Sequence, residues 1–288
     1  MIIYRKMFYN LWRLYGFLKA PYMLDIHVAE HCNLNCIGCN HYSPLAKPAF
    51  CDLPALKHSL NTLRDRKVLN MFDCINLIGG EPLLNPDIIE VLKIAREVAL
   101  TSTSRKRLNI KLITNGLLLH RMPESFWEAC KKYDIIVSVT HYPIALDYNA
   151  IFLLCEEKGV QYECFGDRTV HNGFSLFPLI SKPKDCGKRK LYDNYYKCFM
   201  QCMQLVDNRI YGCPQCAYSK YLNEAFGTSF QEEKGDWLEI DHISKFQLWK
   251  FRFSAKPFCK YCTFPIQTVD WKHSERKAEE WICTDNLV

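Results

Sequence analysis

The chain has 288 residues, of which 49% are hydrophobic and 24% charged, and this size suffices for one α/β barrel-sized domain with a small additional module. Its 12 glycines and 13 prolines are too few for a fibrous or disordered protein. The net charge of +6 is modest and no run of five like charges occurs, so the sequence predicts no nucleic-acid partner.

The first 23 residues form a predicted N-terminal helical extension. Basic residues are scattered among aromatic ones there, whereas a signal peptide has an unbroken apolar stretch. No apolar run of about 18 residues occurs elsewhere, so the sequence predicts a cytoplasmic protein without a membrane-spanning segment. Cytoplasmic thiols stay reduced, and the 16 cysteines therefore favour metal sites over disulfides.

Residues 24–165 alternate short β-branched runs with segments of helical periodicity, which is typical of βαβ units and predicts an α/β fold. We expect strands at residues 24–28, 75–78, 110–114, 135–140 and 160–164. We expect helices at residues 53–66, 86–100, 123–132 and 150–158. The alternation stops after Phe165, where Gly, Pro and Lys collect, and we place a domain boundary near residue 185.

Cys32, Cys36 and Cys39 directly follow the first predicted strand, where α/β barrels carry their active sites. Three thiolates spaced C-x3-C-x2-C can ligate three irons of a 4Fe–4S cluster and leave the fourth iron open. The alternative is a zinc site with His31 or His41 as the fourth ligand, although structural zinc sites usually pair C-x2-C knuckles.

These three cysteines, followed after the second strand by Gly79-Gly80-Glu81-Pro82, resemble the radical S-adenosylmethionine (SAM) superfamily. The resemblance implies a partial (β/α)6 barrel over residues 24–185, with SAM chelating the open iron of the 4Fe–4S cluster. It also implies that Gly79, Gly80 and Glu81 bind the amino group of SAM. Glycines let the backbone approach a ligand closely, and a carboxylate complements an ammonium group.

Two further strand ends fit this resemblance, which implies contacts to the SAM carboxylate and ribose there. They are Thr114-Asn115 after the third strand and Ser138 within the fourth. Each has an ordinary alternative, because Thr-Asn-Gly is a common turn and a strand serine often only packs. The chain departs from the family at Gly38, where an aromatic residue is frequent, and it lacks a clear glycine-rich adenine motif after the fifth strand.

A second group of cysteines begins at Cys186 and surrounds a predicted hairpin at residues 204–211. Its other members are Cys198, Cys202, Cys213, Cys216, Cys259 and Cys262. Few helical patterns occur in this part, and a piece this short has little apolar core of its own, so we expect a metal-stapled module at residues 186–265 and a C-terminal tail at 266–288.

The second group resembles the twitch module, a relative of the larger SPASM module of radical SAM enzymes, with Asn208 at the place of a turn glycine. The resemblance implies an auxiliary 4Fe–4S cluster. Its ligands would be Cys198, Cys213, Cys259 and Cys262. Cys202 and Cys216 are the alternatives for the first two ligands, and zinc is the alternative metal. Five other cysteines lie in or beside apolar runs, and we expect most of them in the core: Cys51, Cys74, Cys130, Cys155 and Cys164.

The resemblance implies an enzyme that reductively cleaves SAM and abstracts a hydrogen atom, with an electron donor such as flavodoxin or ferredoxin. The stretch His41-Tyr42-Ser43-Pro44 is similar to radical SAM proteins of polysaccharide and aminoglycoside-type pathways. It implies a small-molecule substrate, a carbohydrate or cyclitol that is oxidised or epimerised.

One alternative is a peptide or protein maturase, for which the residues before Leu24 are too few to form a leader-binding domain. The other is a non-catalytic iron–sulfur or zinc protein. No single acid, base or hydrogen donor is assigned. The residues near strand ends that can reach the site are His41, Tyr42, His141 and Tyr142.

Overall fold

The computed structural model describes residues 22–102, 108–165, 173–176, 178–181, 188–198, 202–264 and 266–283. Three predictions lie largely or wholly outside these ranges: the N-terminal extension, the domain boundary near residue 185 and the position of Cys186.

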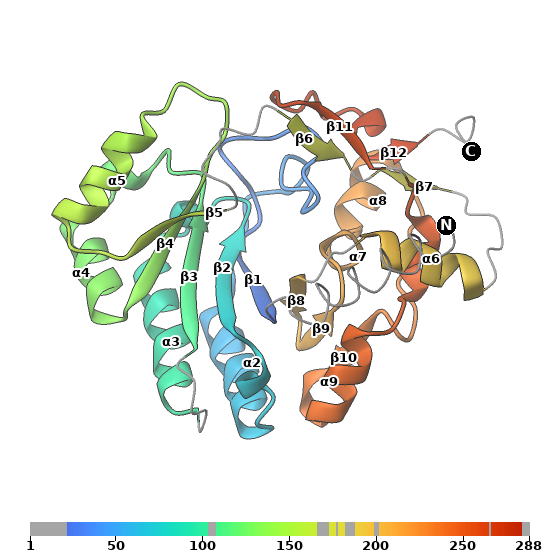
Figure 1. The fold of residues 1–288 in the computed structure, drawn as a ribbon, viewed down its shortest axis with the longest axis horizontal. Coiled ribbons are helices and arrows are strands. Elements are labelled where there is room, and N and C mark those ends of the chain that lie inside the picture. The colour runs from blue at the N-terminus through green and yellow to red at the C-terminus, as the bar shows by residue number, and fades with distance from the viewer. Residues whose placement is uncertain are drawn as a thin grey trace, which may run out of the picture.

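An eight-stranded sheet with the order β10-β9-β8-β1-β2-β3-β4-β5 forms the centre of the molecule (Figure 1). Its six strands from β8 to β5 run parallel, and β9 and β10 are antiparallel additions. The strands are β1 (Met23–Ala29), β2 (Cys74–Gly79), β3 (Asn109–Thr114), β4 (Ile135–Thr140), β5 (Tyr162–Phe165), β8 (Cys202–Val206), β9 (Arg209–Tyr211) and β10 (Trp237–Glu239). This sheet confirms the predicted α/β partial barrel, and β1 to β5 match the predicted strands to within a few residues.

Helices of the first half pack their apolar sides against one face of the sheet. They are α2 (Leu53–Asp65), α3 (Ile88–Leu100), α4 (Glu124–Lys132) and α5 (Tyr148–Glu157). Apolar residues at alternate strand positions, such as Leu24, Ile26 and Val28 of β1, join these helices in one core. Of the five cysteines expected inside, Cys74, Cys130 and Cys155 are buried, and Cys51 and Cys164 are partly exposed.

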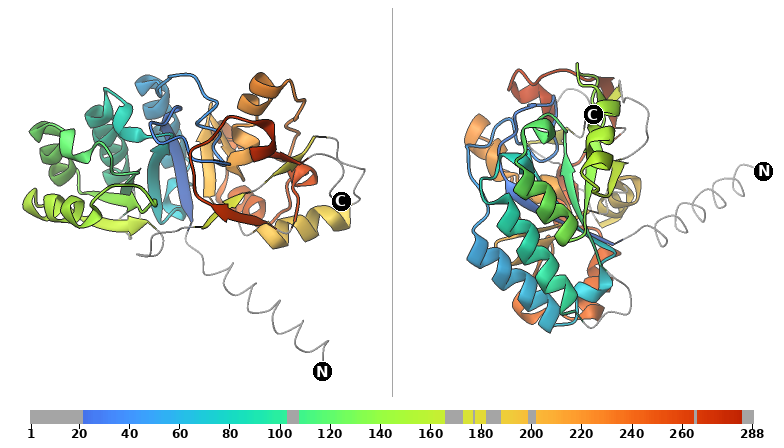
Figure 2. Two further views of the ribbon diagram at one scale, coloured as in Figure 1. Left: turned by 90° about the horizontal axis from the view of Figure 1, so that it is seen from above. Right: turned by 90° about the vertical axis from the view of Figure 1, so that its left-hand side faces the viewer.

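The chain forms two halves, a first half at residues 22–165 and a cysteine-rich second half at residues 173–283. The second half lies beside the first along the long axis of the molecule (Figures 1 and 2). It is joined to the first half through the sheet, because β8 pairs in parallel with β1. The predicted hairpin is confirmed as β8 and β9, with Asp207 and Asn208 of its turn in the left-handed region at φ 47° and 60°.

The expectation of few helices and little core in this half was wrong. The structure contains α6 (Lys188–Cys198), α7 (Pro214–Ala217), α8 (Lys220–Phe226) and α9 (Lys245–Arg252). A second cluster of buried residues, rich in aromatic side chains, includes Tyr218, Leu222, Phe258 and Trp281. The apolar positions are spread over short irregular segments, so no single periodic pattern marked them.

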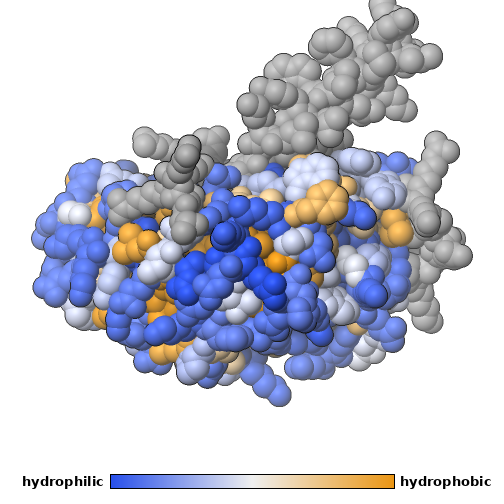
Figure 3. All heavy atoms as spheres, turned by 90° about the horizontal axis from the view of Figure 1, so that it is seen from below, coloured by the Kyte–Doolittle hydropathy of each residue, from blue (hydrophilic) through white to orange (hydrophobic). Residues whose placement is uncertain are grey.

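The C-terminal segment is built into the fold and pairs with strands of the second half. β11 (Gln267–Asp270) is antiparallel to β6 (Gly173–Leu176), and β12 (Ile282–Cys283) is parallel to β7 (Leu179–Ile180). Within the described ranges, none of the helices combines the length and the apolar character needed to cross a lipid bilayer. The lower face of Figure 1, drawn in Figure 3, is mostly hydrophilic with hydrophobic side chains in small scattered groups.

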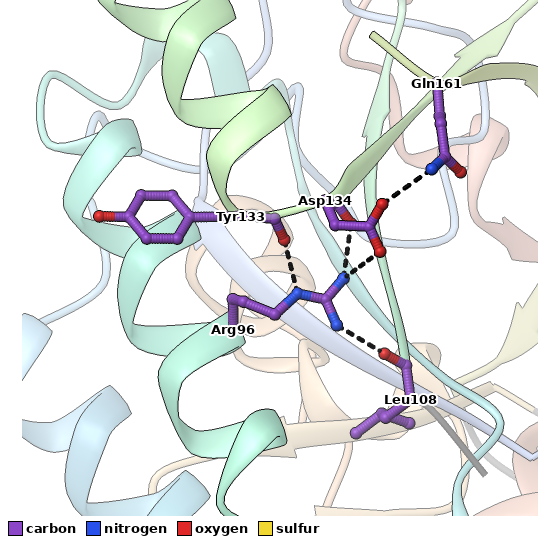
Figure 4. A network of polar contacts seen from close by, with 5 residues as sticks. All are labelled: Arg96, Leu108, Tyr133, Asp134 and Gln161. Carbon is purple, nitrogen blue, oxygen red and sulfur yellow. Dashed lines mark hydrogen bonds and ion pairs between the residues drawn. The ribbon is translucent and has the colours of Figure 1, made fainter.

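Arg96 of α3 ties together the connections that enter β3, β4 and β5 (Figure 4). Its buried guanidinium donates to the carbonyls of Leu108 (3.0 Å), Tyr133 (2.5 Å) and Asp134 (2.5 Å). The Asp134 carboxylate lies 3.5 Å from the same group and accepts from Gln161 at 2.8 Å. This network lies away from the carboxyl ends of the strands and therefore serves the stability of the barrel.

We expect Arg96→Met to lower the free energy of unfolding by about 3–5 kcal/mol, because one buried and two partly buried carbonyls lose their donor. Urea unfolding measures this change. Lys93→Met is the matched control, since Lys93 lies one turn earlier on α3 and pairs only with Glu90. An equal effect of the two substitutions would contradict the assigned role of Arg96.

Candidate functional site

The first cysteine loop leaves the carboxyl end of β1 and is held against the end of β2. The backbone N–H of Gly80 donates to the carbonyl of Ala29 at 2.7 Å, and that of Glu81 donates to the carbonyl of His31 at 3.0 Å. The Gly-Gly-Glu motif is thereby fixed beside the residues that precede Cys32. This contact explains the motif, because a Cβ atom on Gly80 would lie 2.0 Å from the His31 carbonyl oxygen.

We therefore expect Gly80→Ala to lower the free energy of unfolding by about 1–3 kcal/mol and to weaken SAM binding, since two backbone segments must move apart. Gly227→Ala is the control. Gly227 has φ 63° but no atom within 4 Å of an added Cβ, so that variant carries backbone strain of about 1 kcal/mol without a clash. Urea unfolding and calorimetric SAM titration test both, and unchanged SAM affinity in Gly80→Ala would contradict the assignment.

The three thiols of the loop lie close to one another in a buried environment. Burial raises the pKa of Cys32 to about 11 and also raises the pKa values of Cys36 and Cys39. The Cys39 thiol raises the pKa values of Cys32 and Cys36 further, and the Cys32 thiol raises that of Cys36. Backbone N–H groups face the sulfurs, and Leu34 N donates to Cys32 Sγ at 3.3 Å. Buried thiols under N–H donors fit the ligand set of an iron–sulfur cluster. No three His, Cys, Asp or Glu side chains of the described residues are grouped tightly enough to enclose a single metal ion.

Glu81 connects this loop to the end of β3. Its carboxylate accepts from Thr114 Oγ1 at 2.7 Å, from Leu83 N at 3.1 Å and from Asn115 N at 2.9 Å. Burial raises the pKa of Glu81 to about 7. Asn115 in turn donates to Asn33 Oδ1 at 2.8 Å and lies 3.8 Å from Cys32 Sγ. The structure thus brings the cysteine loop, the Gly-Gly-Glu motif and Thr114-Asn115 into one hydrogen-bonded unit.

Ser138 is placed differently, on the inner face of the sheet. Its hydroxyl donates to Glu163 Oε1 at 2.8 Å, and the same oxygen accepts from Lys111 Nζ at 2.7 Å. Further along this face, Asp25 accepts from Asn76 at 2.7 Å and Gln204 at 2.9 Å, and burial raises its pKa. The inner face is therefore lined by charged and amide groups, opposite to the apolar face that the helices cover.

The C-terminal segment closes over the cysteine loop, which the sequence did not reveal. Lys272 and Ser274 exchange backbone hydrogen bonds with the loop, and His273 Nδ1 lies 2.8 Å from the Leu34 carbonyl. Trp281 Nε1 donates to the Cys39 carbonyl at 2.9 Å. Gly38 lies against β6 and this segment, because a Cβ there would lie 2.1 Å from Leu176 Cδ2 and 3.3 Å from the Glu280 carbonyl oxygen, which leaves little room for an aromatic side chain.

The four His and Tyr residues expected near the site have different surroundings. His41 Nδ1 lies 2.5 Å from His27 Nε2, and burial lowers its pKa. His141 packs on Tyr148 at 4.1 Å between ring centroids. Burial raises the pKa of Tyr142, and the three thiols of the first cysteine loop raise it further, so Tyr142 lies near that loop. Tyr42 belongs to the core cluster against which Cys213 and Cys262 of the second cysteine group pack.

That second group also forms a partly buried cluster of thiols. Burial raises the pKa values of Cys213 and Cys262, and the neighbouring thiols of Cys198 and Cys259 raise them further. The Asn194 amide donates to the carbonyls of Cys259 and Cys262 at 2.9 and 3.2 Å, which orients the C-x2-C turn. These four are the cysteines expected from the resemblance, and as a set of partly buried, neighbouring thiols they fit an iron–sulfur ligand set.

The two alternative ligands lie at the edges of this group. Cys216 is buried, which raises its pKa, and Asp236, Cys213 and Cys259 raise it further, so it lies near two of the four thiols. Cys202 lies on β8 and interacts first with Asp25 and Cys74 of the barrel interior. Among the two alternatives, the geometry therefore favours Cys216 over Cys202.

Comparison with known proteins agrees with this geometry. Residues 26–149 match the model of the Radical SAM superfamily. The 7,8-dihydro-6-hydroxymethylpterin dimethyltransferase of Methanocaldococcus jannaschii is 31% identical over 101 residues, which are 34% of this chain and 18% of that protein. The GTP 3′,8-cyclase of Microcystis aeruginosa is 30% identical over 107 residues, 37% of this chain and 31% of that protein. The chain thus spans less than a third of either relative.

A solved structure of BtrN in complex with AdoMet and 2-DOIA is 18% identical, with a TM-score of 0.47, and the alignment covers 85% of this chain and 94% of that one. The matched family segment carries the cysteine loop, the Gly-Gly-Glu motif and Thr114-Asn115. The segment of residues 26–149, which holds this hydrogen-bonded unit, is therefore similar to the radical SAM superfamily.

Proposed function

We propose that this protein is a radical SAM enzyme that cleaves SAM reductively and abstracts a hydrogen atom from a carbohydrate or cyclitol, which it oxidises or epimerises. The observation that carries this proposal is the hydrogen-bonded unit of the cysteine loop, Gly79-Gly80-Glu81 and Thr114-Asn115 at the carboxyl edge of the sheet.

In this unit Cys32, Cys36 and Cys39 would hold the 4Fe–4S cluster. When bound, the cluster and SAM supply a carbon radical that abstracts hydrogen. The buried Glu81 anchors the loops around the SAM amino group, and Tyr142 and the C-terminal segment shield the thiols from water. Ser138 would reach the SAM ribose only alongside its partner Glu163.

The side chains on the inner face of the sheet support the proposal that the substrate is polar. A carboxylate and an ammonium group stand side by side at Glu163 and Lys111, with 35% and 24% of their side chains exposed. Such a pair offers both acceptors and donors, which suits a ligand with several hydroxyl groups. The names of the two curated relatives, a pterin dimethyltransferase and a GTP cyclase, also describe action on small molecules.

For the second group we propose an auxiliary 4Fe–4S cluster on Cys198, Cys213, Cys259 and Cys262. The mutual effect of these thiols on their pKa values supports this set. Such a cluster would accept the electron that an oxidised substrate gives up. We expect the enzyme to act in the cytoplasm, with a flavodoxin or ferredoxin as the electron donor to the first cluster.

The test is an incubation of the anaerobically reconstituted protein with SAM, a reductant and panels of sugars, cyclitols and peptides, with 5′-deoxyadenosine as the readout. We expect a sugar or cyclitol to accelerate its formation. Deuterium at the reacting carbinol carbon should appear in 5′-deoxyadenosine. Acceleration by peptides alone would replace the proposed substrate class with that of a maturase.

A further inference from the structure

Tyr42 starts in the first cysteine loop. Its backbone N–H donates to the Cys39 carbonyl at 2.9 Å, so it belongs to the turn that closes the C-x3-C-x2-C motif. Its φ of 56° is in the left-handed region, which costs a residue with a Cβ about 1–2 kcal/mol. Bulky residues in this conformation cluster at functional sites, where the surroundings impose the strain.

The side chain of Tyr42 leaves this loop and enters the second core. The residue is fully buried, and its ring meets that of Trp281 edge to face at 6.4 Å and 72°. Trp281 itself donates to the Cys39 carbonyl. The two aromatic residues therefore join the first cysteine loop to the core that surrounds the second cysteine group.

The hydroxyl of Tyr42 ends among thiols. Cys216 belongs to the same core cluster as Tyr42, and Cys213 and Cys262 pack against that cluster. Burial raises the pKa of Tyr42, and these three thiols raise it further. Within the described part of the chain no acceptor is found for the Tyr42 O–H. The Gln215 side chain lowers the pKa of Tyr42, as an amide N–H that donates to the phenol oxygen does, and such a contact leaves the O–H itself without an acceptor. A buried hydroxyl without a partner costs free energy, so its place requires an explanation.

We propose that the Tyr42 hydroxyl donates a hydrogen bond to a sulfur atom of the iron–sulfur cluster held by the second cysteine group, and thereby raises the reduction potential of that cluster. This inference rests on the proposed auxiliary cluster. A donor near sulfur stabilises the reduced form, which carries more negative charge. The residue that follows the SAM-binding cysteines by three positions would thus tune the second cluster as an electron acceptor.

Tyr42→Phe tests the proposal, since it keeps the ring and removes only the hydroxyl. The measurement is made in the Cys32→Ala/Cys36→Ala/Cys39→Ala protein, so that the second cluster is the one observed. We expect Tyr42→Phe to shift its midpoint potential downward in an anaerobic redox titration. We also expect the iron–sulfur stretching bands in resonance Raman spectra to lose their shift in D2O.

Tyr218→Phe is the matched control. Tyr218 is buried in the same core, its hydroxyl also lacks a partner among the described residues, and its ring stacks on His27 at 3.8 Å. Burial raises its pKa, and the groups that raise it most after burial are Glu30 and Asp25, in place of the thiols that do so at Tyr42. We expect this variant to leave the potential and the D2O shift unchanged. Equal behaviour of the two variants would overturn the inference.

A second substitution at the same position keeps the inference testable if the Tyr42→Phe protein does not bind iron. Replacing Tyr42 with 3-fluorotyrosine keeps the hydroxyl and makes it a stronger donor, so the potential should rise. A potential that stays the same or falls would overturn the inference. If the unsubstituted second group takes zinc or no metal, the inference and the auxiliary cluster both fail. SAM cleavage by the protein with an intact first loop remains measurable, so the proposed reaction is judged separately.

Discussion

Replacing Cys32, Cys36 and Cys39 together with alanine is expected to abolish formation of 5′-deoxyadenosine from SAM. The three thiols lie in one partly buried loop, and their spacing suits three ligands of an open cubane. The variant protein is reconstituted anaerobically with iron and sulfide, reduced and incubated with SAM, and the nucleoside product is measured. We expect it to retain about four irons per chain in the second group, the content of one cubane.

The matched control removes three thiols from the barrel core, at Cys74, Cys130 and Cys155. These residues are buried away from the loop, and their substitution should lower stability without ending SAM cleavage. If the variant of the cysteine loop still cleaves SAM, the assignment of the first cluster is wrong.

The structure of the barrel half could be predicted because each strand and helix has its own pattern in a short stretch of sequence. Each strand from β1 to β5 is a short β-branched run, and each of the helices α2 to α5 has an apolar stripe that buries against the sheet. The Gly-Gly-Glu motif was also readable, since glycine at residue 80 leaves the space that the His31 carbonyl occupies. Local pattern and tertiary contact point to the same answer in this half.

The structure of the second half was harder to predict because its contacts join residues that are far apart in the sequence. β8 joins the sheet beside β1, from which 172 residues separate it, through main-chain hydrogen bonds that leave no periodic trace. The pairing of His273 with Cys36 is likewise made by backbone groups, and the aromatic residues of the second core come from separate short segments. The sequence also did not indicate that the Ser138 hydroxyl donates to Glu163, and the contact of Ser138 with the SAM ribose stays a prediction.

Glu81 shows how a motif residue can serve two purposes. Both carboxylate oxygens already accept hydrogen bonds from the ends of β2 and β3, yet each oxygen has more than one lone pair. The residue can therefore hold the loops in place before SAM binds and still accept from an ammonium group. Preorganisation of this kind lowers the cost of ordering the site when the ligand arrives.

Replacing Cys259 and Cys262 with alanine, in the variant that lacks the first three cysteines, is expected to remove most of the remaining iron. Both thiols lie within the group around Cys213, and the backbone carbonyls of Cys259 and Cys262 accept hydrogen bonds from the Asn194 side chain. Metal binding and folding are coupled where the apolar core is small, which would predict unfolding of this half. The second core of aromatic side chains opposes that outcome, so we expect new protease cleavage near residues 257–262 while the barrel and the β8–β9 hairpin stay protected.

The control for this experiment replaces Cys202 and Cys283, two cysteines of the same half that lie outside the proposed ligand set. Cys202 faces Asp25 in the barrel interior, and Cys283 lies on β12. Iron content should stay near that of the parent variant, because the four thiols remain. Loss of iron in this control would move the ligand set toward Cys202. Zinc in place of iron in the anaerobically reconstituted parent would make the second group a structural site, and it would remove the electron acceptor on which an oxidation depends.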